Sequence, residues 1–221
     1  MEPREAADKI AEVLEEQREE LAEERAERRV SEQFRSQAAI VIAILAMLLA
    51  ISALGGDHAK KEAVNANIQA SDAWAFYQAK NIRQTTYALS SDQLEALIAS
   101  DGPGLADSAR QSVQAKIEQY RRTVTRYDDE PDPNAPNDPL KGDGKKQLMA
   151  RAQHFEHERD HALAQDPNFD YATAIYQIAI VLGSVSIIAA SRIILLASVA
   201  LGVVASLLLV NGHLLFAKLP G

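Results

Sequence analysis

Apolar positions gather into two long blocks, separated by polar stretches with helical spacing. The first block, residues 38–54, is 17 residues without a charge. A bilayer core about 30 Å thick needs roughly 17–25 apolar residues of helix at about 1.5 Å each, so this block predicts a transmembrane helix. A cleaved signal peptide fits less well, because it would follow a short basic segment, and the segment before this block is long and richer in acids than in bases.

In the second block, residues 171–216, the only Asp, Glu, Lys or Arg is Arg192. As one straight helix it would be about 67 Å long, which is more than twice the hydrocarbon thickness. We therefore expect it to turn at Ser191-Arg192 and to form two spans, 172–190 and 193–210, with Asn211-Gly212 as the stop signal of the last span. A buried soluble hairpin is the alternative, but it would need a large apolar partner surface.

Each predicted span carries small residues three and four positions apart, which let helix backbones approach closely in lipid. This spacing predicts helix–helix packing, within one chain or between chains. The small residues are Ala39, Ala43, Ala46, Ala50 and Ala53 in the first span, Ala179, Gly183, Ser186 and Ala190 in the second, and Ser198, Gly202 and Ala205 in the third.

The polar stretches predict further helices. Residues 1–36 form a charged helical tail with i,i+4 ion pairs and a thin apolar stripe, and a solvated helix is favoured over a weak coiled coil. Residues 57–168 form an extramembrane helical region, in which Asp57 caps a long helix over 57–100. Residues 211–221 are a C-terminal tail.

Within the extramembrane region, a 4-3 spacing predicts a seam for a partner helix. Asp101 to Gly104 reads as a turn, followed by a helix over 105–127, an acidic, proline-rich loop over 128–143, and a helix over 144–165 that ends at Asp166-Pro167. These helices are expected to pack as an extended coiled bundle, a stalk between the first and second spans. The seam consists of Ile68, Asp72, Ala75, Ala79, Ile82, Thr86 and Leu89.

Basic residues near the spans predict the orientation, because they favour the cytoplasmic side. One set precedes the first span or lies in the predicted turn: Arg18, Arg25, Arg28, Arg29, Arg35 and Arg192. The other set lies on the opposite side: Lys60, Lys61, Arg159 and Lys218. The bias predicts a cytoplasmic N-terminus.

Composition argues against several classes of function. The net charge of −8 does not favour nucleic acid as a partner, and the lack of cysteine excludes disulfides, thiolate metal sites and cysteine nucleophiles. No nucleophile elbow, phosphate-binding glycine loop or dinucleotide fingerprint occurs.

Ser71-Asp72-Ala73-Trp74 and Tyr77-Gln78-Ala79-Lys80 follow the first predicted span, and Tyr176-Gln177-Ile178 lies in the second. This order resembles a bacterial membrane family known only as domain of unknown function 4337, over roughly residues 33–210. The resemblance implies a similar number and spacing of spans. It brings no activity, substrate or cofactor.

Three groups of residues are candidate sites. The first group consists of Asp72, Trp74, Phe76, Tyr77 and Lys80. Its two interpretations are an interaction surface and helix packing. The second group, His154, His157 and His161, has the spacing of metal ligands on one helix face, but a solvated polar face is favoured. The third, Asp128 to Asp138, mimics a calcium loop but lacks its glycine and its final glutamate, so a linker is favoured.

The sequence thus predicts an all-α, multi-pass protein of the bacterial inner membrane. It favours a non-enzymatic, self-associating scaffold without a cofactor, whose partners are the lipid bilayer, further copies of itself and an unidentified protein. A small channel or transporter subunit and a metal-binding membrane protein are the alternatives.

Overall fold

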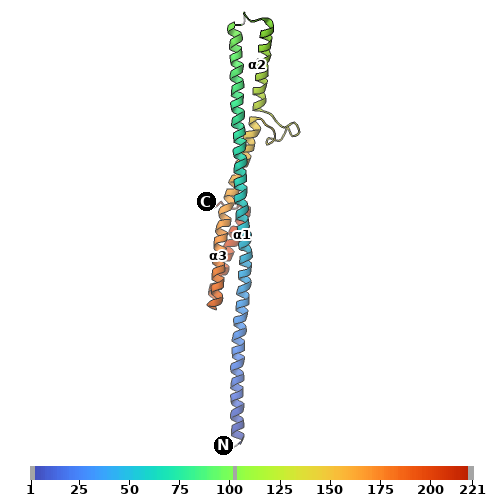
Figure 1. Cartoon of the computed structure of the whole chain (residues 1–221). Coiled ribbons are helices and arrows are strands. Elements are labelled where there is room, and N and C mark those ends of the chain that lie inside the picture. Colours follow the sequence, from blue (N-terminus) through green and yellow to red (C-terminus); the bar gives the residue numbers. More distant parts are fainter. Residues whose placement is uncertain (1–2, 102–103, 219–221) are drawn as a thin grey trace. The chain divides into compact units, whose positions relative to one another are not determined.

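A computed structural model describes residues 3–101 and 104–218. Side chains are described for Arg18, Leu21, Arg25 and residues 28–100 and 104–218. These residues form four helices and no strand (Figure 1). The helices are α1 (Pro3–Asp101), α2 (Asp107–Asp128), α3 (Lys145–Ile188) and α4 (Arg192–Leu214). The all-α prediction is confirmed.

Three helical stretches are long and apolar enough to cross a membrane. They are Arg28–Ser100 within α1, Lys145–Ile188 and Arg192–Leu214. The predicted apolar blocks therefore lie in three helices, and the first block lies inside a much longer helix than a single span requires.

The chain divides into two compact units. Unit 1 contains the residues up to Asp57 together with those from Ala164 onward, and unit 2 contains His58–Leu163. Helices α1 and α3 contribute to both units, whereas α4 belongs to unit 1 and α2 to unit 2.

Unit 1 is a three-helix assembly in which small and polar side chains face inward. The hydroxyl of Ser198 donates to the Ala179 carbonyl over 2.6 Å, and the hydroxyls of Tyr176 and Ser206 lie 2.9 Å apart. Apart from Asn168, the buried positions repeat at intervals of three, four or seven residues, so each helix presents one face. They are Phe34, Ala38, Leu45, Ser52 and Gly56 on α1, Phe169, Ala172, Tyr176, Ala179, Gly183 and Ser186 on α3, and Ser198, Gly202, Ala205, Leu209 and Gly212 on α4.

The small-residue stripes have different places in unit 1. Those of α3 and α4 lie in the helix contacts, except Ala190, which is exposed in the turn after α3. A Cβ on Gly202, for example, would stand 2.5 Å from the Leu45 Cδ2. In α1 the alanine stripe faces outward instead, while larger side chains pack inward. The exposed residues of this stripe are Ala39, Ala43, Ala46, Ala50 and Ala53.

The turn between α3 and α4 lies at residues 189–191, so Arg192 begins α4 and the turn comes slightly earlier than expected. Ala190 has φ +50°, and the Ser191 N–H donates to the Ser186 carbonyl over 3.1 Å. This six-to-one hydrogen bond closes α3 with a left-handed residue, a position that usually holds glycine.

Phe169 sits in a socket made by glycines of two other helices. A Cβ added to Gly55 would stand 2.6 Å from the ring's Cε1, one on Gly56 3.3 Å from its Cβ, and one on Gly212 2.9 Å from its Cε1. The His213 ring packs edge-on against Phe169, with centroids 5.0 Å apart. Three glycines therefore allow one aromatic side chain to approach two backbones.

This socket explains two wrong predictions. Asn211-Gly212 does not end the last helix, because Gly212 is needed for the close approach of Phe169 and Asn211 donates to the Asn168 Oδ1 over 2.6 Å. Asp57 caps no helix, because α1 continues through Gly55 and Gly56. Asn211-Gly212 and Gly55-Gly56 therefore serve the packing of helices, although such residues commonly mark the end of a helix.

The expected end of a helix at Asp166-Pro167 does not occur either, since α3 runs through Pro167. Proline removes one backbone donor from the helix and disturbs the preceding turn. The Asn168 side chain, which is fully buried, donates to the Ala164 carbonyl over 3.2 Å in this turn. The boundary between the two units falls just before it, between Leu163 and Ala164.

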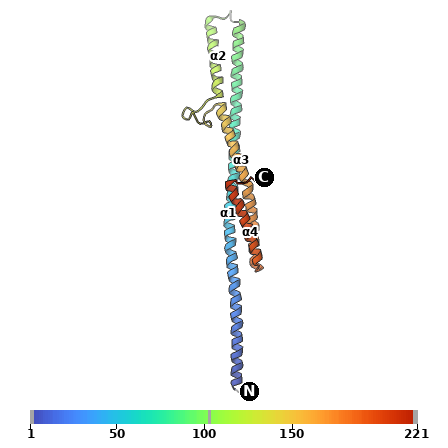
Figure 2. The same ribbon diagram turned by 180° about the vertical axis from the view of Figure 1, so that it is seen from behind.

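In unit 2, α2 lies beside the C-terminal part of α1 in both views (Figures 1 and 2). Tyr87 of α1 packs against the rings of Tyr120 and Tyr127 of α2, with centroids 5.2 and 6.0 Å apart. Gln84 donates to the Val124 carbonyl over 2.8 Å. Of the predicted 101–104 turn, Gly102 and Pro103 lie outside the described residues.

The N-terminal tail is helical from Pro3 as part of α1. Of its predicted apolar stripe, Leu21 is 51% exposed. The side chains of Ile10 and Leu14 lie outside the described residues.

Candidate interaction surface

The residues predicted as an interaction surface divide between two sides of α1. Trp74, Tyr77 and Lys80 are partly buried, whereas Asp72 and Phe76 are exposed. Successive residues of a helix are separated by about 100°, so this short segment reaches both sides. The first three side chains make contacts within unit 2, and the other two are exposed.

Trp74 and Tyr77 connect α1 with α3. The Trp74 indole Nε1 donates to the Glu156 Oε1 over 2.9 Å, and its ring packs edge-on against Tyr77 at 5.5 Å between centroids. Lys145, at the start of α3, lies with its Nζ 5.9 Å from the centre of the Tyr77 ring. An indole that packs and donates a hydrogen bond at the same time fits a structural role.

Lys80 holds the proline-rich loop through what we term the Lys80 clamp: Lys80, Tyr127, Glu130 and Asp143. Its Nζ donates to the Glu130 Oε2 over 2.8 Å and to the Asp143 carbonyl, and lies 5.0 Å from the centre of the Tyr127 ring. The Asp143 N–H donates to the Glu130 carbonyl over 2.9 Å and closes the loop on itself. Only 15% of the Lys80 side chain is exposed, so this lysine is occupied within its own chain.

A second group of polar side chains joins the start of the loop to α3. Gln147 donates to the Asp129 Oδ1 over 2.8 Å, and the Lys146 Nζ lies 2.9 Å from its Oδ2. The hydrogen bonds from Gln147 and then Lys146 hold the pKa of the Asp129 carboxyl below its ordinary value. The hydrogen bond to Asp129 in turn raises the pKa of Lys146.

These shifts predict the pH range in which this contact stabilises the loop. A lowered carboxyl pKa contributes stability above the ordinary Asp value of about 3.9, and that contribution is lost as the pH falls through the lowered value. We expect the Asp129 carboxyl carbon to titrate by NMR with a midpoint below the ordinary value. Gln147→Ala should move the midpoint upward, and an ordinary midpoint in the unaltered chain would contradict the contact.

The outward side of unit 2 contains the predicted 4-3 seam. All seven seam residues, from Ile68 to Leu89, are exposed, so the predicted spacing is present but these residues do not pair within the chain. The side of α1 that packs inward has the same spacing two positions earlier and begins with small residues, which permit close helix contact. It is formed by Ala59, Ala63, Ala66, Ala70, Ala73, Tyr77, Lys80, Gln84, Tyr87 and Ser91.

We call the seven predicted residues, from Ile68 to Leu89, the outer seam. Ile68 is 54% exposed, Ile82 67% and Leu89 57%, and the neighbouring Phe76 is 66% exposed. Large aliphatic side chains spaced in this way are typical of a helix that packs against another helix.

The histidines of α3 do not assemble a metal site. His154, His157 and His161 are exposed, and the His154 Nε2 lies 3.2 Å from the Glu158 Oε1. Within the described residues, no three His, Asp or Glu side chains lie close enough to hold a metal ion together. In the acidic loop, the Asp132 and Asp138 carboxylates accept hydrogen bonds from the backbone N–H groups of Asn134 and Leu140, which is the usual behaviour of aspartate in turns.

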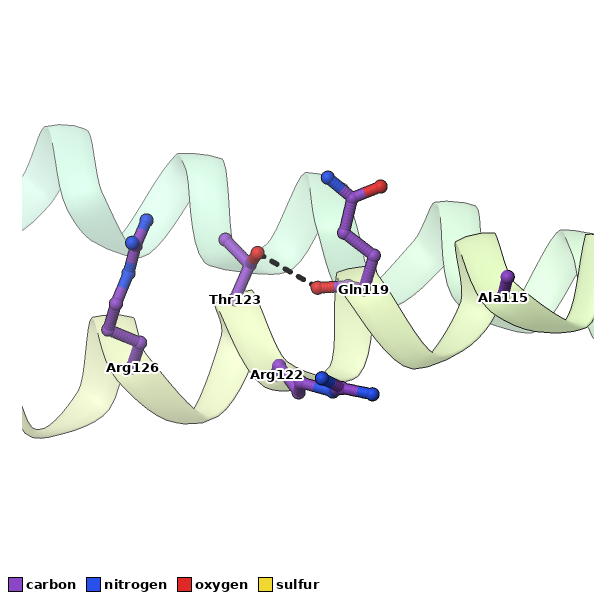
Figure 3. A pocket seen from close by; sticks show the side chains of 5 residues that line it. All are labelled: Ala115, Gln119, Arg122, Thr123 and Arg126. Atoms are coloured by element: carbon purple, nitrogen blue, oxygen red, sulfur yellow. Dashed lines mark hydrogen bonds between the residues drawn. The ribbon is translucent and has the colours of Figure 1, made fainter.

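A hollow of about 420 Å³ lies on α2 (Figure 3). Arg122 and Arg126 line it, and each pairs with a carboxylate: Arg122 with Glu118 at 3.5 Å and Arg126 with Glu130 at 3.6 Å. Thr123 donates to the Gln119 carbonyl within the same helix, as the dashed line shows. Both basic groups therefore already have a carboxylate partner within the chain, and this hollow is a weak candidate for a ligand.

Sequence reasoning missed the partners of Trp74 and Lys80, since Glu156, Glu130 and Asp143 are distant in sequence and no local spacing links them. It also missed the Phe169 socket. The signal that could have revealed the socket is the Gly55-Gly56 pair inside an otherwise uninterrupted helical pattern.

The comparison with known families agrees with this architecture. Residues 34–215 match the family described as Domain of unknown function (DUF4337). No curated protein and no solved structure is significantly similar to the chain. Because the match covers most of its length, including the predicted spans 38–54, 172–190 and 193–210, the chain belongs to the DUF4337 family.

Proposed function

We propose that this protein is a non-enzymatic membrane scaffold that self-associates through the outer seam of α1. The exposure of this regularly spaced apolar face is the observation that carries the proposal. In this proposal unit 1 lies in the bacterial inner membrane, and unit 2 forms a helical stalk outside it.

The membrane placement is supported by the inverted polarity of unit 1. Its interior contains many small and hydroxyl-bearing side chains beside a few large ones, while its surface carries large aliphatic side chains, which is favourable when the surrounding solvent is lipid. The most exposed include Ile188 at 87%, Ile193 at 80% and Leu54 at 70%. Exposed apolar surface of this extent is rare in proteins that are surrounded by water.

A second copy is the occupant that best fits the outer seam. The stretch from Ile68 to Leu89 spans about three heptads, near the lower limit for a coiled coil, so the expected association is weak in solution. Membrane anchoring gives all copies the same orientation and raises their effective concentration. Two parallel copies then bring identical seams together, and Ala75 and Ala79 leave room for close approach.

The orientation that we propose places the N-terminus in the cytoplasm. Arg28, Arg29 and Arg35 precede the first apolar block, and Arg192 follows the α3–α4 turn, so all four would then lie on the cytoplasmic side.

Single cysteines test the self-association, because the native chain has none. We expect Ile82→Cys to form an oxidised dimer in intact membranes, since a disulfide requires Cα atoms about 4.4–6.8 Å apart. Thr85→Cys is the matched control: it is exposed on the same helix, about a quarter turn from the seam. Equal crosslinking at both positions, or none at either, would exclude the seam.

Asp72 provides a test of whether the two copies pair in parallel. In a parallel pair it would face its own copy, and facing like charges oppose association. Asp72→Asn should therefore increase the dimer fraction in the Ile82→Cys background. A decrease would argue against parallel pairing.

Neither alternative has a comparable observation in its favour among the described residues. A channel needs a polar path, yet the hydroxyls of Ser52, Thr173, Tyr176, Ser198 and Ser206 already bond to groups within unit 1. A metal-binding role would need ligands that converge.

A further inference from the structure

One cavity in unit 1 combines apolar walls with two arginines from separate helices. Its volume is about 440 Å³, and it lies between α1 and the α3–α4 turn. Its lining is formed by Val30, Ser31, Phe34 and Arg35 of α1 and by Ile187, Ala190 and Arg192.

Among the described residues, the two guanidinium groups have no competing partner. No hydrogen bond or ion pair joins Arg35 or Arg192 to another described residue, and no carboxylate is among the residues that line the cavity. The arginines of the hollow on α2, by contrast, both pair with glutamates. Two unpaired guanidinium groups facing one cavity favour an anionic ligand with several acceptor oxygens.

The N-terminus of α4 also favours an anionic ligand. Arg192 is its first residue, and the preceding Ser191 makes no side-chain capping bond. The first N–H groups of a helix lack intrahelical partners and carry partial positive charge. They lie at the same turn as the Arg192 guanidinium, so backbone and side chain both favour negative charge there.

The apolar part of the lining identifies the class of ligand. Val30, Phe34, Ile187 and Ala190 provide no charge or side-chain hydrogen bond, and Phe34 is only 9% exposed. A free inorganic anion would leave these walls unused, whereas a phospholipid carries both a phosphate and hydrocarbon. The cavity also lies next to the ends of two uncharged stretches, where headgroups meet a membrane helix.

We propose that this cavity binds an anionic phospholipid, whose phosphate pairs with Arg35 and Arg192 and whose apolar portion packs on Phe34 and Ile187. The proposal rests on the membrane placement of unit 1 proposed above. It adds a lipid partner of defined charge and leaves the self-association seam unaffected.

Native mass spectrometry of the full chain tests this. The protein is extracted from nanodiscs of equal phosphatidylglycerol and phosphatidylcholine, and bound lipid is counted per chain. We expect retention of phosphatidylglycerol over phosphatidylcholine and a loss of about tenfold or more in Arg35→Gln/Arg192→Gln, since charge-assisted hydrogen bonds are lost. Millimolar inorganic phosphate should not displace the lipid.

A matched variant, Arg18→Gln/Arg29→Gln, removes the same charge from exposed residues that do not line the cavity, and it should retain the lipid. Equal loss in both variants, equal retention of the two lipids, or displacement by inorganic phosphate would overturn the proposal. Unchanged melting of both variants shows that lipid loss is not unfolding. If Ile82→Cys still crosslinks in membranes while lipid selectivity is absent, only this inference fails.

Discussion

Replacing Phe169 by alanine is expected to lower the stability of unit 1 by about 3 kcal/mol, the low end of the range for a buried Phe→Ala change. Phe169 is 3% exposed, and Gly55, Gly56 and Gly212, which surround its side chain, have no side chains of their own to fill the space that it would leave. The low end applies because, in the proposed membrane placement, the loss is mainly one of packing.

Unfolding of the purified protein in detergent measures this effect. Phe216→Ala is the matched control, because Phe216 is 79% exposed and lies beyond the end of α4. We expect Phe216→Ala to unfold like the native chain. Similar stability of the two variants would show that the glycine socket is not a determinant of unit 1.

Replacing Lys80 by methionine is expected to release the proline-rich loop and to destabilise unit 2 by about 2 kcal/mol, the typical contribution of hydrogen bonds to charged groups. Methionine keeps the aliphatic stem but cannot donate to the Glu130 carboxylate or the Asp143 carbonyl. Limited proteolysis should then cut within residues 128–143, which we expect to resist cleavage in the native chain.

Lys141→Met provides the comparison within the same loop. Lys141 lies 3.8 Å from Asp138, and its side chain is 59% exposed, so its ion pair should contribute less than about 1 kcal/mol. Equal cleavage of the two variants would mean that the Lys80 clamp does not hold the loop.

The sequence predicted the helical class and the three apolar stretches because both depend on local patterns. Hydrophobic runs and 3- and 4-residue spacings are properties of single helices, so the stripes around Gly183 and Gly202 could be recognised without knowing their partners. The apolar stretches of unit 1 could therefore be predicted from their length and composition alone.

Which side of α1 packs inward in unit 2 could not be read from spacing alone. Both the outer seam and the opposite side have the 4-3 period, and the large side chains of Ile68 and Ile82 made the outer seam the more obvious choice. The inward side begins with alanines such as Ala66 and Ala70, whose importance lies in how closely α3 approaches. Contacts such as Lys80 with Glu130 join residues 50 positions apart and have no local signature.

The short connection at residues 189–191 has a consequence for biosynthesis. In the proposed membrane placement, a nascent chain that stops after α3 would present the Tyr176 hydroxyl to lipid, because its hydrogen-bond partner Ser206 and the rest of α4 would not yet cover that face. Polar groups without partners are costly in hydrocarbon. We therefore expect α3 and α4 to enter the bilayer as a pair, and truncated chains to be poorly inserted and rapidly degraded.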